Sequence, residues 1–188
     1  GDNMKKFILL FIILFLVPTF VNAESNTVKL SKCVDGDTAR FIIDGKEYST
    51  RFLAIDTPET KHPKKKVEPY GKEASNYTCN SLKKASKIVL EYDSNSTKED
   101  KYGRRLAWVF VDGELLQKKL VNKGYAKVAY LYGDYKYTDE LKMIENSAKS
   151  KKLGVWSDSI YEEDTDSILD EILEKIFKYV RKEIKSML

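Results

Sequence analysis

Three extended segments follow one another near the start of this chain, with no helical pattern between them. Residues 28–33 and 38–43 combine apolar and β-branched side chains, and Asp44-Gly45 separates them from a third segment at 47–55. An Asp-Gly pair between two extended segments is a strong signal for a tight hairpin turn. The order of these segments predicts an antiparallel meander and argues against a doubly wound α/β sheet, in which helices alternate with parallel strands.

The rest of the chain adds strands and helices in an irregular order. Its patterns predict strands at 88–92 and 104–111, and helices at 71–87, 115–121 and 138–152. The middle helix is expected to end near Gly124, and the lysine- and proline-rich residues 61–69 are expected to form an exposed loop. Helices inserted between five or so short strands predict a mainly β member of the α+β class. The best match is an OB-type, five-stranded Greek-key β-barrel with three helices.

The first residues have the three-part layout of a secretory signal. Lysines follow Met4, an apolar run covers 7–17, and small residues end at Ala23. A membrane-spanning helix needs roughly 20 apolar residues, and this run is shorter. We therefore expect residues 1–23 to be a signal peptide that is removed on export, with a retained membrane anchor as the alternative. Residues 1–3 precede Met4, the expected initiator, and have no place in this layout.

Two cysteines, Cys33 and Cys79, are present together with a single histidine, His62. These three side chains are too few for a closed tetrahedral zinc site. In an oxidising, extracellular compartment an even number of cysteines predicts a disulfide, with two buried free thiols as the alternative. The formal net charge of +4 permits an anionic partner, but it is far below what binding nucleic acid by charge alone requires.

The end of the chain, residues 159–188, is an addition to the domain expected at 24–158 and predicts an amphipathic helix. Branched apolar residues recur every four positions along it, at Ile168, Ile172, Ile176, Val180 and Ile184. Acidic residues precede this stripe and basic residues gather late, which complements the helix dipole. Such a helix needs a surface to lie against. We expect its own domain or a second copy of the chain, with a membrane surface, and hence attachment to the cell surface, as the alternative.

Carboxylates and arginines gather near the ends of the predicted strands, at 35–38, 51–59 and 100–104. Hard divalent cations take oxygen ligands, and the planar guanidinium group matches a phosphate with two hydrogen bonds. This mixture is what metal-assisted attack on a phosphodiester requires, so the sequence predicts a nuclease. Each segment alone is more often turn chemistry than a metal site, and their combination carries the prediction.

The carboxylates have distinct expected roles. Asp37 and Asp56 can project from the rim of a barrel and hold calcium, and Asp35 and Thr57 can supplement them with oxygen atoms. Glu59 follows at the end of the same segment and can act as a general base or orient a water molecule.

The arginines are harder to place from the pattern. Arg51 is a candidate to bind the phosphate, but strict strand alternation puts it on the face opposite Asp56, so a bend, a bulge or a strand end is needed. Alternation also cannot choose between Arg104 and Arg105 as the second phosphate-binding residue.

In combination the motifs resemble the thermonuclease, or staphylococcal nuclease, family. The stretches that carry the resemblance lie in order over roughly residues 27–158: 35–38, 51–59, 61–65, 70–71, 73–75, 100–104, 106–107, 126–130 and 156–157. The resemblance implies an OB-fold, secreted endonuclease that needs one calcium ion, cleaves DNA and RNA regardless of the sugar, and leaves 3′-phosphates. An OB-fold module that only binds nucleic acid is the alternative, and such modules lose the carboxylates.

Matching positions carry the family's roles onto this chain. The implied metal ligands are Asp37, Asp56 and Thr57, the catalytic residues are Arg51, Glu59 and Arg104, and the substrate-binding residues are Lys101, Tyr102 and Tyr130. Three features depart from the resembled pattern. Arg105 stands in place of a glycine, Cys33 and Cys79 have no counterpart, and the helix at 160–188 is additional.

Overall fold

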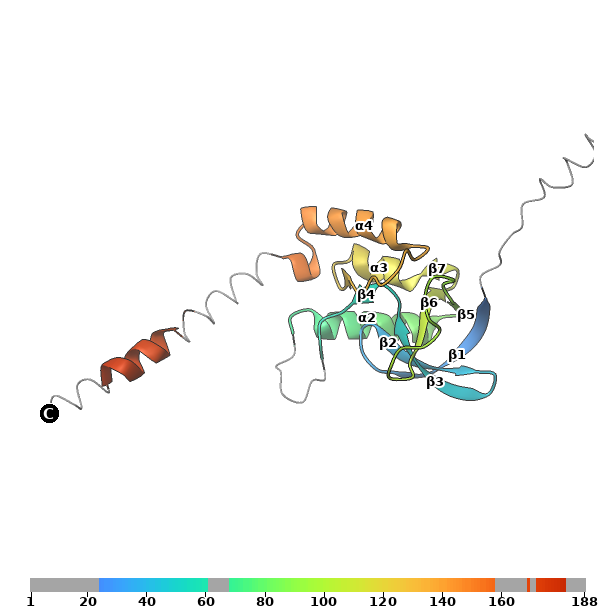
Figure 1. Cartoon of the computed structure of the whole chain (residues 1–188), viewed down its shortest axis with the longest axis horizontal. Coiled ribbons are helices and arrows are strands. Elements are labelled where there is room, and N and C mark those ends of the chain that lie inside the picture. Colours follow the sequence, from blue (N-terminus) through green and yellow to red (C-terminus); the bar gives the residue numbers. More distant parts are fainter. Residues whose placement is uncertain (1–23, 61–67, 158–168, 170–171, 182–188) are drawn as a thin grey trace, which may run out of the picture.

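The computed structural model describes residues 24–60, 68–157, 169 and 172–181. The predicted signal peptide and most of the predicted loop at 61–69 fall outside these residues. Figure 1 shows the strands gathered together, with three helices layered on them. The helices are α2 (Gly71–Lys84), α3 (Leu116–Asn122) and α4 (Thr138–Ser150), followed by a 3₁₀ turn at Gly154–Trp156.

The predicted meander is confirmed. Strand β1 (Ser25–Cys33) pairs antiparallel with β2 (Thr38–Ile43), which pairs antiparallel with β3 (Lys46–Phe52). Asp44 and Gly45, between β2 and β3, have φ angles of 49° and 79°. Positive φ at both central residues is what a type I′ hairpin turn requires, and Asp-Gly supplies it at low cost.

The remaining strands close the sheet into a barrel. Strand β5 (Ile88–Glu91) pairs antiparallel with β1 and with β6 (Arg105–Val111). Parallel pairing of β3 with β6 then joins the two edges, with Arg51 opposite Leu106. The five strands thus form a closed, mixed barrel, which confirms the predicted mainly β OB-fold and excludes the doubly wound sheet. Closure also removes exposed edges that could pair with other chains.

The barrel interior is filled by large apolar side chains from different strands. Phe41, Phe52, Leu90 and Trp108 are almost completely buried. Burying each such side chain stabilises the fold by roughly 1.5–3 kcal/mol relative to leaving it exposed. The indole nitrogen of Trp108 donates a hydrogen bond of 2.8 Å to Asp93, which satisfies the polar atom of this ring inside the core.

Some elements differ from the predictions. The segment at 47–55 is two strands, because β3 ends at Phe52 and the chain turns before β4 (Ile55–Asp56). Helix α2 ends at Lys84, since Ala85 is already extended. The short strands β7 (Glu114–Leu115) and β8 (Lys127–Val128) were not predicted, because two-residue strands carry too little pattern.

The predicted disulfide is present. Cys33, the last residue of β1, is bonded to Cys79 on α2, with 5.5 Å between the two Cα atoms. The bond closes a loop with a sequence separation of 46 residues. A cross-link over a loop of this size contributes about 3–4 kcal/mol in the chain-entropy account of the unfolded state.

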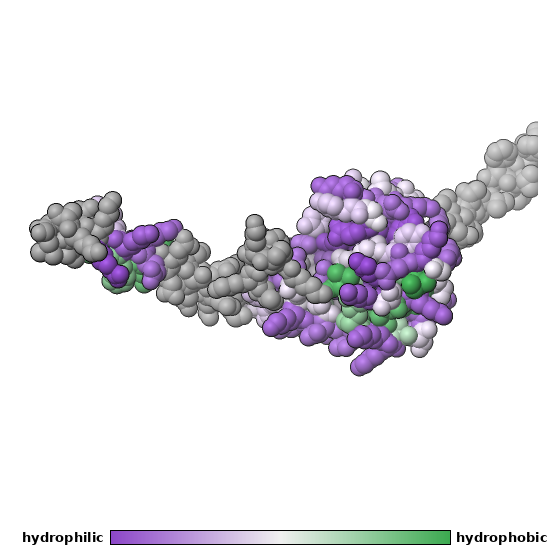
Figure 2. Space-filling model, turned by 90° about the horizontal axis from the view of Figure 1, so that it is seen from below, coloured by the Kyte–Doolittle hydropathy of each residue, from purple (hydrophilic) through white to green (hydrophobic). Residues whose placement is uncertain are grey.

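Residues 169 and 172–181 of the predicted C-terminal helix are helical. In Figure 2 the apolar side chains of 172–181 gather on one side of the helix and the hydrophilic side chains on the other. The apolar side chains are exposed: Leu169, Ile172, Leu173, Ile176, Phe177 and Val180. What covers this face stays a prediction. Within the described ranges, no helix combines the length and apolar character that crossing a membrane requires.

Candidate active site

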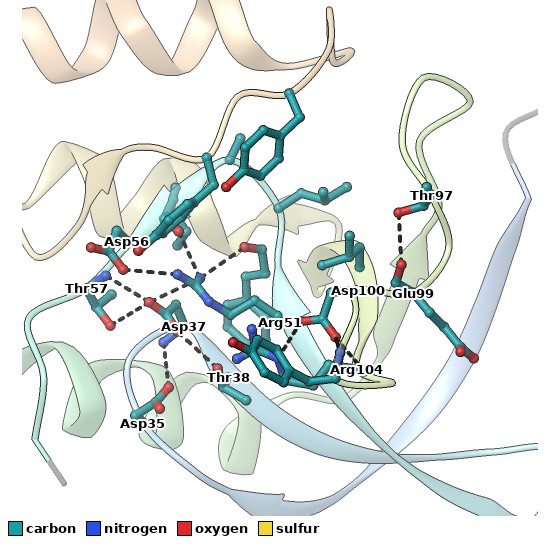
Figure 3. Close-up of a pocket in the computed structure, with 18 of the residues that line it drawn as sticks. Asp35, Asp37, Thr38, Arg51, Asp56, Thr57, Thr97, Glu99, Asp100 and Arg104 are labelled. Carbon is teal, nitrogen blue, oxygen red and sulfur yellow. Dashed lines mark hydrogen bonds and ion pairs between the residues drawn. The ribbon is translucent and has the colours of Figure 1, made fainter. Parts of the chain in front are cut away.

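A cleft of about 810 Å³ lies beside the corner between β3 and β4. Its walls come from the turn before β2, from the corner itself, from the loop before β6 and from the segment after β8. Figure 3 shows Asp37 and Asp56 directed toward Arg51, with Arg104 and Asp100 in the same cleft. The barrel therefore brings together residues that lie up to about 100 positions apart in the chain.

Asp37 is the most deeply buried of the carboxylates that line the cleft, with 5% of the residue exposed. Its Oδ2 atom accepts hydrogen bonds from the backbone nitrogen and the hydroxyl group of Thr57, at 2.8 and 2.9 Å. Its Oδ1 atom accepts one from Thr38 at 3.0 Å. Gly36 is needed beside it, because a Cβ atom there would stand 2.6 Å from the Thr57 hydroxyl oxygen. The turn before β2 and the end of β4 are thus packed directly against each other.

Arg51 lies between two carboxylates. Its Nη1 atom is 3.1 Å from Oδ2 of Asp37, and its Nη2 atom is 3.0 Å from Oδ1 of Asp56. Nη1 also donates to the carbonyl oxygen of Ile55 at 2.8 Å, and only 12% of the side chain is exposed. Figure 3 shows this guanidinium group joined to both carboxylates. A planar group with several donors in fixed directions is suited to such bridging.

The corner after β3 explains how Arg51 and Asp56 reach the same side. Ala54 has a φ angle of 61°, in the left-handed region that non-glycine residues seldom adopt. This turn breaks the strand between Phe52 and Ile55, so the alternation of side chains restarts in β4. The expectation that a strand end or a bend is needed is confirmed.

Burial and the nearby charge of Asp37 raise the pKa values of two carboxyl groups in the cleft. Burial, and then the negative charge of Asp37, raise the pKa of Asp35 from 3.8 to about 6. Burial and the charge of Asp37 also raise the pKa of Asp56 above its ordinary value. The charge of Arg51 acts in the opposite direction and lowers both pKa values, but burial and Asp37 outweigh it.

The donor set fits a hard cation. Asp37 and Asp56 meet at one guanidinium group, so their oxygens converge on a common cationic position. Oxygen ligands of this kind suit calcium, and the backbone carbonyl of Thr57 and the carboxylate of Asp35 are close along the chain. No cluster of three or more histidine, cysteine, aspartate or glutamate side chains at metal-binding distance occurs in the described part of the chain.

Arg104 lies across the cleft, in the loop just before β6. Its Nε atom donates to Oδ2 of Asp100 at 2.7 Å, and its backbone nitrogen donates to Oδ1 at 2.9 Å. Burial alone would raise the pKa of Asp100, but hydrogen bonds from the backbone and side chain of Arg104 outweigh it and lower this pKa. Tyr102 lies beside this pair, with its ring 5.6 Å from the guanidinium carbon of Arg104 and 5.0 Å from Nζ of Lys101.

The structure separates Arg104 from Arg105, which the sequence pattern could not do. Arg104 lines the cleft, whereas Arg105 is the first residue of β6 and does not line it. Arg105 is 2.8 Å from Oε1 of Glu99 and lies 4.5 Å from the centre of the Tyr48 ring. Arg105 therefore neither joins the phosphate-binding candidates nor projects freely into solvent.

Glu59 lines the cleft three residues beyond Asp56. Its Oε1 atom accepts a hydrogen bond of 2.9 Å from the backbone nitrogen of Thr60. Its own backbone nitrogen donates to the Glu68 carboxylate, and the Glu68 nitrogen donates to the Glu59 carbonyl oxygen, each at 3.0 Å. These paired bonds fix the backbone of Glu59 beside that of Glu68.

Tyrosines form the outer wall of the cleft. Tyr130 has a φ angle of 56°, and its ring centre lies 5.4 Å from the guanidinium carbon of Arg51. Tyr132, which is 84% exposed, has its ring 6.5 Å from that of Tyr130. Tyr132 and Tyr135 line the cleft but were not among the predicted site residues. The tyrosine-rich segment at 125–132 contained the signal for Tyr132, which shares the strand-like alternation of Tyr130.

The arrangement suits a phosphodiester in a groove. Two carboxylates that can hold a cation lie near one arginine, a second arginine faces them, and exposed aromatic rings flank the entrance. Guanidinium groups bind phosphate oxygens, and aromatic rings stack on bases.

Comparison with known proteins finds one family model and several curated relatives that the chain resembles. Residues 49–158 match the family model described as staphylococcal nuclease homologue. Endonuclease YncB of Bacillus subtilis is 45% identical to the chain over 135 residues, and this match covers 71% of the chain and 63% of the relative. The SPbeta prophage-derived endonuclease YokF of the same organism is also 45% identical over 135 residues, a match that covers 71% of the chain and 45% of the relative. The thermonuclease of Staphylococcus hyicus is 38% identical over 136 residues, which cover 72% of this chain and 79% of the relative.

The two Bacillus relatives are longer than the matched region. The chain spans less than two thirds of either of them, 63% and 45% of their lengths.

The buried position of Asp35 predicts a pH-dependent stability difference. Because its folded-state pKa is raised, this group stabilises the fold fully below pH 3.8, and that contribution is lost as the pH rises through about 6. Asp35→Asn removes the ionisable group. With a chelator present, the variant should gain about 1–3 kcal/mol over the parent chain at pH 7, and clearly less near pH 4. Urea unfolding at both pH values measures the difference, and an equal difference at the two would contradict the burial argument.

Proposed function

Since the chain belongs to the staphylococcal nuclease homologue family, we propose that it is a calcium-dependent endonuclease that hydrolyses phosphodiester bonds of DNA and RNA and leaves 3′-phosphates. The observation that carries this proposal is the position of Arg51 between Asp37 and Asp56, with Arg104 across the same cleft. Clustered carboxylates beside a polyanion would weaken a module that only binds nucleic acid. They are useful where a cation and a phosphate must meet.

Calcium would be held by Asp37, Asp56 and the backbone carbonyl of Thr57. When bound, it would neutralise charge on the phosphate and so make the phosphorus easier to attack. The chain's own part is to keep the two carboxylates aimed at one position. The hydrogen bonds that Thr57 and Thr38 donate to Asp37 fix the orientation of its carboxylate before any ligand binds.

The two arginines would bind the phosphate from two sides. Arg51 has one guanidinium face over Tyr130 and its edge toward the carboxylates, so it is held firmly. Arg104 lines the cleft and is held at Nε by Asp100. Fixed cationic donors stabilise the extra negative charge that develops in a five-coordinate transition state, because they need not reorganise.

Glu59 would act as the general base. Its carboxylate borders the cleft next to Asp56 and would take a proton from the attacking water while the leaving 5′-oxygen departs from phosphorus. The hydrogen bond from Thr60 to Oε1 orients the carboxylate group.

Substrate breadth follows from the kinds of group in the cleft. Lys101 and the two arginines offer charge to phosphates, and Tyr102 and Tyr130 offer ring faces to bases. Phosphate contacts carry no sequence information, and stacking accepts every base. We therefore propose that DNA and RNA are both substrates.

The assignment of phosphate binding to Arg104 and not to Arg105 predicts different turnover rates for variants of the two residues. Arg104→Ala should lower turnover about 10²–10³-fold, because a preorganised donor to the transition state is lost. Arg105→Ala is the matched control and should keep turnover close to that of the parent chain, since Arg105 does not line the cleft and is paired with Glu99. Steady-state cleavage of single-stranded DNA measures both, with circular dichroism to verify folding. Similar losses in the two variants would refute the assignment.

The general-base role of Glu59 predicts that its substitution lowers the turnover rate but not the affinity for nucleic acid. Glu59→Gln should lower the turnover rate by orders of magnitude with little change in affinity for a DNA oligonucleotide, because the amide cannot accept the proton. Glu73→Gln, at an exposed position on α2, provides the control. A near-native turnover rate in Glu59→Gln would remove Glu59 from the mechanism.

We further propose that the chain is exported and that residues 1–23 are removed, leaving a domain at 24–158 and an extension at 159–188. The Cys33–Cys79 bond supports this, because disulfides persist in oxidising compartments. N-terminal sequencing of protein recovered from the culture medium should begin at Glu24. Retention of residues 1–23 would contradict cleavage.

The C-terminal extension is proposed to pack on its own domain or on a second copy. Its described apolar side chains form one exposed stripe, which supports a packing role. Truncation after Tyr161 should change stability or sedimenting mass but leave liposome co-sedimentation as low as for the full chain. Liposome binding by the full chain that disappears on truncation would instead establish a membrane-binding helix.

A further inference from the structure

The disulfide begins at the turn that carries the deepest carboxylate of the site. Cys33 ends β1, and the turn at 34–37 follows it directly with Asp35 and Asp37. On the other side, Cys79 and its neighbour Thr78 lie on α2. The hydroxyl group of Thr78 donates a hydrogen bond of 2.6 Å to the carbonyl oxygen of Gly36, in the middle of the turn. Two successive residues of one helix therefore hold the turn, one by a covalent bond and one by a hydrogen bond.

The turn needs such support because it concentrates negative charge. Asp35 and Asp37 stand two residues apart, and the backbone nitrogen of Asp37 donates to Oδ1 of Asp35 at 3.2 Å. Like charges at this spacing favour conformations that move them apart. The nitrogens of Val34 and Asp35 bond to the carbonyl oxygen of Thr38, and the carbonyl oxygen of Asp37 accepts a hydrogen bond of 2.8 Å from Phe52 of β3. The link to α2 opposes an outward movement of the turn.

The cross-link also encloses most of the site. The segment from Cys33 to Cys79 contains the residues proposed to bind calcium and to move the proton: Asp37, Asp56, Thr57 and Glu59. Arg104 and its loop lie outside it. Cys33 and Cys79 are each only partly buried. Disulfides that are not deeply buried are more labile, and regulatory disulfides are drawn from them.

We propose that the Cys33–Cys79 disulfide positions the Asp35–Asp37 turn for calcium, and that a dithiol reductant which opens it weakens calcium binding and lowers the proposed nuclease activity. The inference rests on the proposed function only for its last part. In the reaction a thiolate of the dithiol attacks one cysteine sulfur and forms a mixed disulfide. The second thiol of the reagent then closes its own disulfide, so that two electrons and two protons pass to Cys33 and Cys79.

The expected loss of calcium affinity follows from the fraction of molecules in which the turn is correctly placed. The apparent dissociation constant equals the intrinsic one divided by that fraction. If reduction leaves the turn placed in about one molecule in ten, calcium binding weakens about tenfold. Thr78 and the strand ends still hold the turn after reduction, so binding is weakened and not abolished.

The test compares the oxidised full chain with the same chain in dithiothreitol. Calorimetric titration with calcium chloride measures the dissociation constant, and hydrogen exchange follows the amides of Val34, Asp35, Asp37 and Thr57. Reduction should weaken calcium binding about tenfold. It should also accelerate exchange at these amides, while amides of β5 and β6 exchange as before. Equal exchange of the turn in the two states overturns the proposal, and so does a uniform acceleration across the barrel, which would mean general unfolding.

Two variants separate positioning from general stability. Thr78→Val keeps the disulfide and the side-chain shape but removes the bond to Gly36, so it should weaken calcium binding and enlarge the effect of dithiothreitol. Val28→Ala removes buried methyl groups at the other end of β1 and should leave the calcium affinity unchanged. A loss of calcium affinity in Val28→Ala as large as that in Thr78→Val would overturn the proposal.

The exchange measurement also distinguishes this inference from the proposed function. An oxidised chain that binds calcium and responds to dithiothreitol, but cleaves no nucleic acid, would refute the nuclease and leave the positioning role intact. A chain that cleaves nucleic acid, but whose turn exchanges at the same rate and whose calcium affinity is unchanged in dithiothreitol, would refute the positioning role and leave the nuclease intact.

Discussion

The ion pairs that Arg51 makes with Asp37 and Asp56 are the interaction on which the site depends. Carboxylates that lose contact with water destabilise a fold unless a positive charge or hydrogen-bond donors compensate them. Here one guanidinium group compensates the buried carboxylate of Asp37 and also pairs with the half-exposed carboxylate of Asp56, at 3.1 and 3.0 Å. Because the group is planar and held by the Ile55 carbonyl, it also sets the direction in which the carboxylates point. The same atoms thus hold the fold together at this corner and prepare the site for a cation and a phosphate.

The closed barrel brings three loops to the corner between β3 and β4. Parallel pairing of β3 with β6 places Arg51 opposite Leu106, so the loop before β6 must pass close to the end of β3. That loop carries Arg104, fixed by Asp100. The turn between β1 and β2 contributes Asp37, and the segment after β8 contributes Tyr130, whose left-handed backbone turns its ring over Arg51. Strain of this kind is tolerated where the surroundings determine the conformation, and it is common at functional sites.

Local features were predictable from the sequence, because a few neighbouring residues encode them. The Asp44-Gly45 turn, the meander and the end of α3 at Gly124 are of this kind, and the closed barrel followed from the order of the segments. The disulfide was predictable because two cysteines allow one pairing. The break at Ala54 was needed by the chemistry, but its location was not readable, since alanine carries no preference for positive φ. Arg104 could not be told from Arg105, because strand alternation does not say at which residue a strand begins. Tyr132 was missed because an aromatic residue in an extended segment is as often core as surface, and only the tertiary structure shows it exposed.

The central claim is that a cation held by Asp37 and Asp56 makes this cleft a nuclease for both kinds of nucleic acid. The most direct test is to incubate the chain from Glu24 onward with single-stranded DNA, duplex DNA and RNA, first with calcium and then with an excess of chelator. The account predicts that all three are cleaved with calcium, that the products carry 3′-phosphates, and that cleavage stops when the chelator is added. Cleavage that continues in chelator would contradict the role of the carboxylates. Binding of all three nucleic acids without cleavage would show that the chain is a binding module.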